Sequence, residues 1–455
     1  MRSNLRYPLA AVALSLGLAG CGGSDDNNSE FPDGYLQFYN GSANSAVTTM
    51  SGVEQGTLGS AAFGDATSMF SLDAGDVDIE FYRTDSDDQQ VLVDEMTVNL
   101  SEGDKTLVML TGDYSNPVFS EYTFEREDMV DHFRLFATST IETNGSYDVY
   151  MSDSGAPFES ANLLGTVTYQ GFDEFAYWDG DEDSDDFDEG EYTIYLTAPG
   201  GSEVLFESPT INFGFATEYV LAIRESTGAI QDAVQIDLIT NSSSVTTYAD
   251  TDATAQYRIY NSLDGDATLT VSLDGNDTEG QEIALDANTL SDFTDIEFGD
   301  YRLSAQNADA SLSFNNRLVT LNQGQSKAIV LYMDAEQKLS SLSFAESNLP
   351  QVYDKEVRAV NLVPDFVDVD LYFVRKDETI ESAQFVLSSI DFGESKELSL
   401  PSDFYELIAV YDGNEDTQQL LDRTQLLGLN EEQNYIITIE PSTDSPTGYA
   451  ISLLY

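Results

Sequence analysis

Short alternations of apolar and polar residues recur along the chain. Residues 77–81 (Val-Asp-Ile-Glu-Phe), 269–273 (Leu-Thr-Val-Ser-Leu) and 367–371 (Val-Asp-Val-Asp-Leu) each carry an apolar side chain at every second position. Side chains of a strand point alternately to the two faces of its sheet, so each segment has one apolar face. Turn signals such as Asp264-Gly265 and Asp412-Gly413 separate such segments. The pattern predicts an all-β chain with helices of at most a turn or two.

Four segments begin alike, which indicates a tandem repeat. They are residues 36–40, 133–137, 257–261 and 357–361, spaced by 97, 124 and 100 residues. A second landmark, Leu-Ser-Glu-Gly at 100–103 and Leu-Asn-Gln-Gly at 321–324, repeats after 221 residues, the sum of the first two spacings. A period near 100 residues is that of a domain array, because solenoid repeats run about 20–50 residues. We expect four tandem immunoglobulin-like β-sandwiches, each with about seven strands, at 34–129, 130–250, 251–350 and 351–455.

The composition excludes several classes of partner and chemistry. The chain has 82 acidic and 18 basic residues, a net charge of −64. Binding to a nucleic-acid backbone needs Lys and Arg facing phosphate, so we expect no nucleic-acid partner, and docking on anionic lipid is disfavoured. One His and one Cys exclude a disulfide framework, Cys/His zinc sites and nearly every His-dependent catalytic scheme. We therefore predict a protein that is not an enzyme.

The first residues of the sequence predict where in the cell the protein is located. Arg2 and Arg6 precede an apolar run at 9–18, which is too short to cross a bilayer, so we interpret residues 1–20 as a signal peptide. The sequence Leu-Ala-Gly-Cys at 18–21 resembles the lipobox of bacterial lipoproteins. That resemblance implies cleavage before Cys21, a diacylglyceryl group on its thiol and an acyl chain such as palmitate on its amine. Gly22 favours the outer membrane by resemblance to Gram-negative sorting rules, and residues 21–33 form the lipidated Cys and a flexible polar tether.

The fourth repeat resembles a known family. Residues 357–372 read Val-Arg-Ala-Val-Asn-Leu-Val-Pro-Asp-Phe-Val-Asp-Val-Asp-Leu-Tyr, which is similar to the opening of the domain of unknown function 4397 family of secreted and lipid-anchored bacterial proteins. Phe-Gly at 63–64 and at 392–393 resembles the middle of that family. The family's His is replaced in the four repeats by Asn40, Ala137, Asn261 and Asn361, so any role of that His is absent. The resemblance implies a small β-sandwich and no established activity.

The densest cluster of charge lies at 173–191, where eleven of nineteen residues are acidic. Carboxylates at every second residue, as in calcium loops, are Asp179, Asp181, Asp183 and Asp185. Counted from the first of these, positions six and twelve are Ser184 and Gly190, where an EF-hand has Gly and Glu. Two interpretations stay open: a weak, hydrated Ca²⁺ or Mg²⁺ site at these four carboxylates, or a solvated hairpin loop.

Aromatic residues and the single histidine lie near this loop. Phe175, Tyr177 and Trp178 directly precede it and either stack on a sugar or pack against the sandwich, and packing is the commoner use. His132 stands at a domain junction, just before a predicted strand. A catalytic triad would have to use it, whereas the simpler interpretation is a residue of the linker.

Three arginines occupy one place in three repeats, Arg134, Arg258 and Arg358. Basic residues are rare in this chain, so their placement is informative. We favour a cross-strand or interdomain ion pair with a carboxylate over a role in ligand binding.

The expected function is that of a non-catalytic outer-membrane lipoprotein that acts as a cell-envelope binding, adhesion or scaffold module. Its expected partners are the membrane, through the anchor at Cys21, and an envelope protein or polysaccharide of unknown identity. The alternatives are a divalent-cation or polysaccharide binder that uses the acidic loop, and a periplasmic factor for envelope assembly. The sequence does not decide between the periplasmic face and the cell-surface face of the outer membrane.

The acidity gives a first testable prediction. Repulsion among surface carboxylates is screened in salty water, because the Debye length falls from about 30 Å at ~0.01 M to about 4 Å at ~0.5 M salt. We expect a higher melting temperature in ~0.5 M NaCl than in ~0.01 M NaCl, measured by circular dichroism. A melting temperature independent of salt would contradict this account of the charge.

Overall fold

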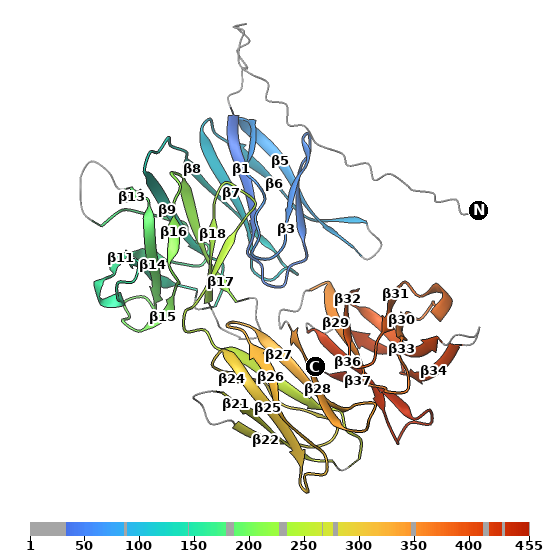
Figure 1. Cartoon of the computed structure of the whole chain (residues 1–455). Helices are drawn as coiled ribbons and strands as arrows, with labels where there is room; N and C mark the ends of the chain where they lie inside the picture. Colours follow the sequence, from blue (N-terminus) through green and yellow to red (C-terminus); the bar gives the residue numbers. More distant parts are fainter. Residues whose placement is uncertain are drawn as a thin grey trace, which may run out of the picture.

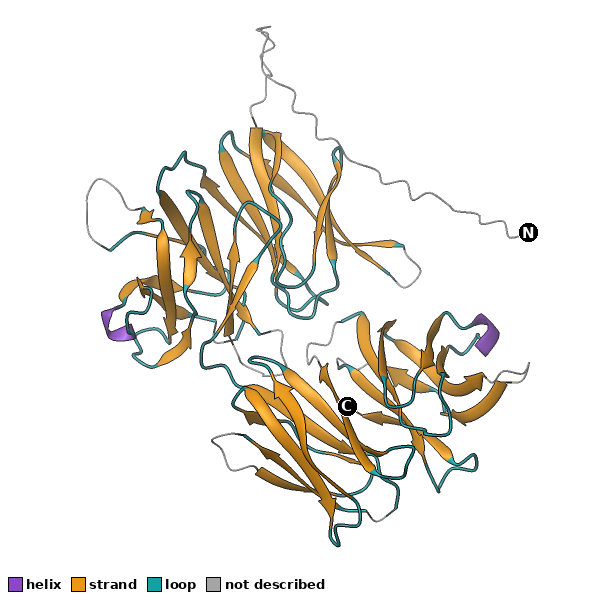
Figure 2. Ribbon diagram, in the orientation of Figure 1, coloured by secondary structure: helices purple, strands orange, loops and turns teal. Residues whose placement is uncertain are grey.

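The computed structural model describes residues 33–85, 89–143, 145–178, 186–226, 234–265, 267–275, 281–346, 352–412, 418–429 and 433–454. Strands dominate these residues (Figure 2), and the helices among them are two single 3₁₀ turns, η1 (Phe158–Ser160) and η2 (Ile380–Ser382). The prediction of an all-β chain is confirmed. In the described part of the chain, no helix has the length and hydropathy needed to span a membrane.

The strands form four successive sandwiches, coloured from blue to red in Figure 1. Sandwich 1 contains β1 (Asp33–Asn40), β2 (Thr48–Gly52), β3 (Gly56–Ala61), β4 (Phe70–Asp73), β5 (Gly75–Thr84), β6 (Gln90–Leu100), β7 (Asp104–Thr111) and β8 (Val118–Glu125). Sandwich 2 contains β9 (His132–Ser139), β10 (Tyr147–Asp153), β11 (Asn162–Val167), β12 (Asp173–Phe175), β13 (Phe187–Asp188), β14 (Gly190–Thr197), β15 (Val204–Glu207), β16 (Ile211–Phe213), β17 (Glu218–Glu225), β18 (Val234–Ile239) and β19 (Thr246–Ala249).

The second half of the chain follows the same plan. Sandwich 3 contains β20 (Ala255–Asn261), β21 (Leu269–Asp274), β22 (Gln281–Leu285), β23 (Thr289–Leu290), β24 (Thr294–Ile296), β25 (Gly299–Asn307), β26 (Ser313–Leu321), β27 (Ser326–Met333) and β28 (Leu339–Glu346). Sandwich 4 contains β29 (Asp354–Asn361), β30 (Val369–Val374), β31 (Phe385–Ile390), β32 (Ser395–Pro401), β33 (Asp403–Asp412), β34 (Gln418–Arg423), β35 (Leu427–Leu429), β36 (Tyr435–Pro441) and β37 (Tyr449–Leu454).

All four sandwiches share one strand order, which confirms the tandem repeat. Each has an inner sheet, ordered β4-β1-β7-β8 in sandwich 1, and an outer sheet, ordered β3-β2-β5-β6. The inner sheets of sandwiches 2, 3 and 4 are β12-β9-β17-β18-β19, β23-β20-β27-β28 and β32-β29-β36-β37. In every inner sheet the first strand pairs in parallel with β7 or its counterpart: β1 with β7, β9 with β17, β20 with β27 and β29 with β36.

The repeated Asn ends the first strand of three sandwiches. Asn361 Nδ2 donates to the carbonyls of Phe366 and Ile390, and its Oδ1 accepts from the backbone N–H of Val363. Asn261 makes the corresponding three bonds in sandwich 3, and Asn40 is likewise fully buried. The side chain therefore satisfies backbone groups that would otherwise be buried without partners at the strand end.

The register of the second repeat differs from the predicted one. The residue after the repeated Asn donates its backbone N–H to β7 or to the strand that corresponds to β7. Gly41, Ser262 and Leu362 do so in three sandwiches, and Thr140 does so in sandwich 2. Ser139, not Ala137, is therefore the counterpart of the Asn, and Arg134 lies two residues before the place of Arg258 and Arg358. A shift by two residues keeps every side chain on its face, so the alternation could not reveal it.

In three sandwiches a tyrosine anchors the strand that corresponds to β5, namely β14, β25 and β33. The hydroxyls of Tyr192, Tyr301 and Tyr405 each donate to the backbone carbonyl four residues upstream, in Asp188, Glu297 and Pro401, at 2.8, 2.5 and 2.9 Å. Sandwich 1 has Val77 at this place. Such a corner is typical of immunoglobulin-like sandwiches, although here the order of the strands is that of the repeat described above.

Inner and outer sheets differ in burial, and the sequence pattern follows that difference. Strand β5 of an outer sheet alternates, because Val77, Ile79 and Phe81 are buried and the residues between them are not. Strand β17 of an inner sheet is buried from Glu218 through Arg224. Near-continuous apolar runs are typical of strands covered on both faces. The predicted alternation starts at Val367, but strand β30 begins two residues later, at Val369. The residue before it, Asp368, adopts a positive φ of 71°, which a strand does not allow.

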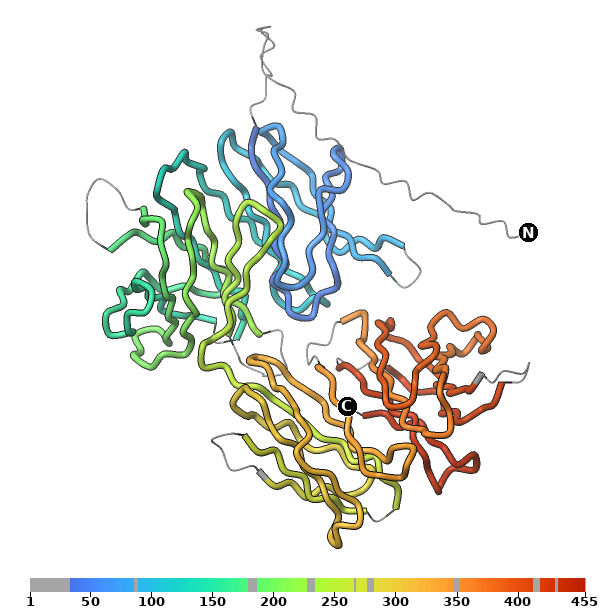
Figure 3. The backbone as a smooth tube through the Cα atoms, viewed as in Figure 1, coloured from blue at the N-terminus to red at the C-terminus, as the bar shows by residue number. Residues whose placement is uncertain are grey.

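The second face of each inner sheet is covered by another sandwich. Sandwiches 1 and 2 pack inner sheet against inner sheet through one apolar cluster that contains Tyr39, Leu107, Met109, Phe136 and Val220. Sandwiches 3 and 4 do the same through Tyr260, Val330, Phe344, Val360 and Ile436. The four domains are thus two face-to-face pairs, visible as blue beside green and yellow beside red in Figure 3.

Each interface holds a buried carboxylate that accepts a bond from the same repeat position. Tyr39 donates its hydroxyl to Asp237 Oδ2 at 2.8 Å, across the first interface. Tyr260 donates to Glu440 Oε1 at 3.0 Å, across the second. Asp237 also accepts from Arg224 Nε at 2.6 Å, and both of these side chains are buried. Buried charges need such partners, so these contacts fix how the sheets face each other.

The glycine of the Phe-Gly landmark is explained by the same interfaces. Gly64 and Gly393 have φ of 80° and 75°, and their N–H groups bond the carbonyls of Asn40 and Asn361. A Cβ on Gly64 would lie 3.0 Å from Arg224 of sandwich 2, and one on Gly393 would lie 3.0 Å from Tyr332 of sandwich 3. Glycine is needed at both places because the turn is left-handed and the partner sandwich lies close.

The two pairs also touch each other. Tyr353, just before β29, forms a T-shaped ring contact with Tyr114 of sandwich 1, with centroids 5.8 Å apart, and the guanidinium of Arg83 lies over the Tyr353 ring at 3.8 Å. The backbone N–H of Val352 donates to the carbonyl of Asn44 at 3.0 Å. At the other junction, Gln323 of sandwich 3 donates to the carbonyls of Asp250 and Thr251. Val352, Asp250 and Thr251, which are described residues of the two junctions, are therefore each bonded to a neighbouring sandwich.

We predict that Arg224→Met destabilises the first pair by about 3–5 kcal/mol, because Asp237 would remain buried without its cation. Urea unfolding followed by fluorescence measures the loss. Arg302→Met is the matched control: this arginine is exposed on β25, and its removal should cost no more than about 0.5 kcal/mol. Equal effects of the two substitutions would contradict the role of the buried ion pair.

Candidate functional site

The predicted metal ligands Asp179, Asp181, Asp183 and Asp185 lie outside the described residues, as does the predicted lipidation site Cys21. Within the described ranges, no group of three or more His, Cys, Asp or Glu side chains is placed to hold a metal ion. The cation site in the acidic loop therefore stays a prediction.

The aromatic residues before the acidic loop pack against sandwich 2. Phe175 is buried in its core, and Tyr177 and Trp178 are half-buried against the same core. Trp178 lies 4.4 Å from Tyr177 and 6.2 Å from Phe187, measured between ring centroids. These contacts support the packing interpretation of the three residues.

His132 opens β9 and faces Asp188 on the neighbouring β13. Its Nδ1 lies 3.0 Å from Asp188 Oδ1, and both side chains are exposed to solvent. The position at the start of sandwich 2 supports the interpretation as a residue of the domain junction.

The three arginines form ion pairs with carboxylates, as expected. Arg134 Nε donates to Glu174 on the adjacent β12 at 2.7 Å, Arg258 Nη2 lies 2.7 Å from Glu346, and Arg358 pairs with Glu397 across β29 and β32. Two of them also touch the partner sandwich. Arg134 Nη1 donates to the carbonyl of Glu125 in sandwich 1, and Arg358 lies over the ring of Phe344 in sandwich 3.

A cavity opens at the same end of each paired interface. One of about 270 Å³ lies between sandwiches 1 and 2 and is lined by Gly112 and Thr140, among others. Another of about 300 Å³ lies between sandwiches 3 and 4, where Met333 and Leu362 are the counterparts of those two residues. The pairing of the inner sheets therefore creates both cavities, and the two cavities lie at corresponding positions in the repeat.

The two cavities differ in chemistry. The cavity between sandwiches 1 and 2 is lined by the acidic side chains Asp113, Glu142 and Glu225. Apolar residues dominate the lining of the cavity between sandwiches 3 and 4: Leu263, Leu312, Met333, Leu362, Pro364 and Pro441. Ligand sites in proteins are concave and mostly apolar, with volumes from about 300 Å³ upward, so the second cavity is the candidate site.

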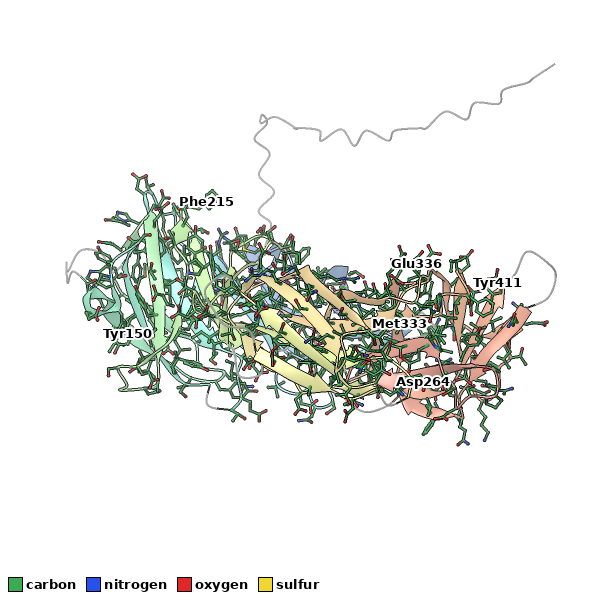
Figure 4. The ribbon with its side chains drawn as sticks, turned by 60° about the horizontal axis from the view of Figure 1, so that its bottom comes forward. Tyr150, Phe215, Asp264, Met333, Glu336 and Tyr411 are labelled. Carbon is green, nitrogen blue, oxygen red and sulfur yellow. The ribbon has the colours of Figure 1, made fainter. Side chains whose placement is uncertain are left out.

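One carboxylate stands at the edge of the candidate site. Asp264 of sandwich 3 accepts a bond from the backbone N–H of Thr443 in sandwich 4 at 2.6 Å. The hydrogen bonds from Thr443 lower the pKa of this carboxyl. Asp264 therefore stays ionised at neutral pH and ties the two walls of the cavity together. Figure 4 shows Asp264 and Met333 where the yellow third sandwich meets the red fourth.

Comparison with known proteins adds little to this geometry. No family model and no curated protein matches the chain. Among solved structures, the TIE protein of Bacillus anthracis aligns with 89% of this chain and 67% of its own, at 9% identity and a TM-score of 0.14. A structure described as a proposed cell adhesion protein of Bacteroides ovatus aligns with 49% of this chain and 98% of its own, at 9% identity and a TM-score of 0.21. Similarity this low carries no argument about function.

Glu440, next to Pro441 of the candidate site, gives a pH-dependent prediction. Burial raises the pKa of its carboxyl, and the like charge of Asp264 adds to that effect. The hydrogen bonds donated by the hydroxyls of Ser452, Thr438 and Tyr260 oppose it without cancelling it. The folded protein then binds the proton more tightly than the unfolded chain, so the stability from this group is present below the unfolded pKa and is lost as pH rises through the folded pKa.

Glu440→Gln removes this titration. We expect the melting temperature of the variant, relative to the unsubstituted protein, to rise as the pH increases from about 4.5 toward neutrality. Differential scanning calorimetry at a series of pH values measures the difference. A difference that is constant with pH would show that Glu440 titrates as it does in the unfolded chain.

Proposed function

We propose that this chain is a non-catalytic lipoprotein of the outer membrane that acts as a cell-envelope binding module, with its binding site in the cavity between sandwiches 3 and 4. The observation that carries the proposal is this apolar cavity of about 300 Å³, which is shared by two domains. The pairing of inner sheets holds its two walls in place before any ligand arrives. A preformed site loses less conformational entropy on binding than a flexible one.

The lining of the cavity indicates which ligand group it accepts. Its walls are leucine, methionine and proline side chains, and Asp264 is the carboxylate among the lining residues. The chain as a whole carries a net charge of −64. Anionic ligands are repelled by that field, so an uncharged or cationic apolar group of an envelope component suits the site best.

The anchor part of the proposal rests on the sequence. The single cysteine of the chain stands at the end of the lipobox-like Leu-Ala-Gly-Cys, and twelve residues separate it from Gly34 in β1. Several acyl chains, each methylene worth about 0.8 kcal/mol when buried, would hold such a protein firmly at a bilayer surface. The polar tether allows the four sandwiches to stand clear of that surface.

A cavity-filling substitution tests the binding site. Ala267 lines the cavity, whereas Ala284 is exposed on β22 of the same sandwich. We expect Ala267→Phe to weaken the binding of a neutral solvatochromic dye at least about tenfold, equal to about 1.4 kcal/mol, and Ala284→Phe to leave it unchanged. Fluorescence titration measures both. Equal affinities in the two variants would place apolar binding elsewhere on the protein.

A separate substitution tests the anchor. Cys21→Ser removes the thiol that the lipid would occupy, so we expect the variant to leave the membrane fraction and the unsubstituted chain to stay in it. Ser24→Ala in the tether serves as the control. Membrane association that survives Cys21→Ser would contradict lipidation and would leave the proposed binding site, which the dye titration tests separately, untouched.

A further inference from the structure

A lysine lies fully buried in the interface between sandwiches 1 and 2. Lys105 belongs to β7 of the first inner sheet and has no exposed surface. Its Nζ donates to Oδ1 of Asn241 in sandwich 2 at 2.9 Å. Lysine is among the residues least often found fully buried, so this placement needs an explanation.

The carboxamide of Asn241 is held with its two ends in different surroundings. Its oxygen faces the amine of Lys105, while its Nδ2 donates to Thr217 Oγ1 at 3.0 Å and to Glu218 Oε2 at 3.4 Å. Its backbone carbonyl accepts from the N–H of Met69 in sandwich 1 at 3.1 Å. The amide nitrogen therefore points at a carboxylate, and the carbonyl points at an amine.

Glu218 is the third member of the cluster. Its side chain is 1% exposed on β17, and Arg126 Nε lies 3.7 Å from its Oε2. Lys105 and Glu218 occupy the same place in their repeats. Each pairs with a residue five positions before the last residue of the first strand: Lys105 with Tyr35, and Glu218 with Arg134. In sandwich 3 this place holds Ser326. The amine, the amide and the acid therefore meet because two inner sheets face each other.

We propose that Lys105 and Asn241 join in an intramolecular isopeptide bond that ties sandwich 1 covalently to sandwich 2. The amine of Lys105 attacks Cγ of Asn241, the Nζ–Cγ bond forms and the Cγ–Nδ2 bond breaks. Glu218 takes a proton from the attacking nitrogen and gives it to Nδ2, which leaves as ammonia. Atoms and charges balance without an oxidant, a reductant or a cofactor.

The distances suit the attack. A carbonyl bond of about 1.23 Å places Cγ within roughly 4 Å of Nζ, given the 2.9 Å contact to Oδ1. Holding two reacting groups in such geometry replaces an encounter in solution by a step within one molecule, which lowers the entropic part of the barrier. The folded interface supplies that geometry.

The environment also favours the reactive form of the amine. Burial lowers the pKa of Lys105 to about 7, opposed by the charge of Glu218 and assisted by Arg126. A substantial fraction of the amine is then neutral at neutral pH, and only the neutral amine is a nucleophile. An amine of ordinary pKa would be almost entirely protonated.

A peptide map of the full chain tests the proposal. Trypsin cuts after Lys105, and Asn241 lies in the tryptic peptide 225–258. With the bond formed, cleavage after residue 105 is blocked, and peptide 84–126 is recovered joined to peptide 225–258 at the sum of their masses less one ammonia. Recovery of 84–105, 106–126 and an unmodified 225–258 as separate peptides would overturn the proposal.

Variants separate the reaction from the fold. Glu218→Gln removes the proton carrier, and Asn241→Ala removes the acceptor; each should yield the separate peptides. Lys327→Met is the matched control, because Lys327 stands near the start of β27 of sandwich 3 and donates to the carbonyl of Thr320. It should leave the joined peptide intact. If a variant fails to fold, the map of the unsubstituted chain still decides, and a joined peptide in folded Glu218→Gln would exclude Glu218 as proton carrier.

Discussion

The apolar second face of the inner sheet is the constraint on which the rest of this structure depends. A sandwich of about 100 residues buries one face of each sheet in its own core, and the other face normally meets water. Here the inner sheets carry apolar residues on both faces, as the continuous burial of β17 shows. That second face has to be covered, and another inner sheet covers it. Four sandwiches therefore become two pairs.

Several other features follow from that pairing. Tyr39 and Tyr260 find carboxylate acceptors only because a partner sheet lies opposite, and Gly64 and Gly393 are needed because the partner lies close. The two cavities open at corresponding ends of the interfaces, and the apolar one has walls from both sandwiches 3 and 4. The meeting of Lys105 with Asn241 has the same origin. The proposed binding site between sandwiches 3 and 4 and the proposed bond between sandwiches 1 and 2 thus both depend on the pairing of inner sheets.

The sequence predicted the fold better than the site. Alternation at 77–81 identified an outer strand, and the recurrence of Asn40, Asn261 and Asn361 identified the repeat, because both signals are local. The register of the second repeat was missed, since a shift of two residues leaves the face of each side chain unchanged. The cavity could not be predicted, because Leu263, Met333, Leu362 and Pro441 come from separate segments of two domains. Lys105, a charge beside the apolar run 107–110, was a signal that went unused.

Small-angle X-ray scattering of the protein in solution tests the face-to-face pairing most directly. The structure predicts a compact particle, in which sandwiches 1 and 2 and sandwiches 3 and 4 lie side by side and Tyr353 joins the pairs. The scattering curve calculated from this structure should fit the measured one. A much larger radius of gyration, with the maximum dimension of four domains in a row, would mean that the inner sheets are not paired and would contradict the account.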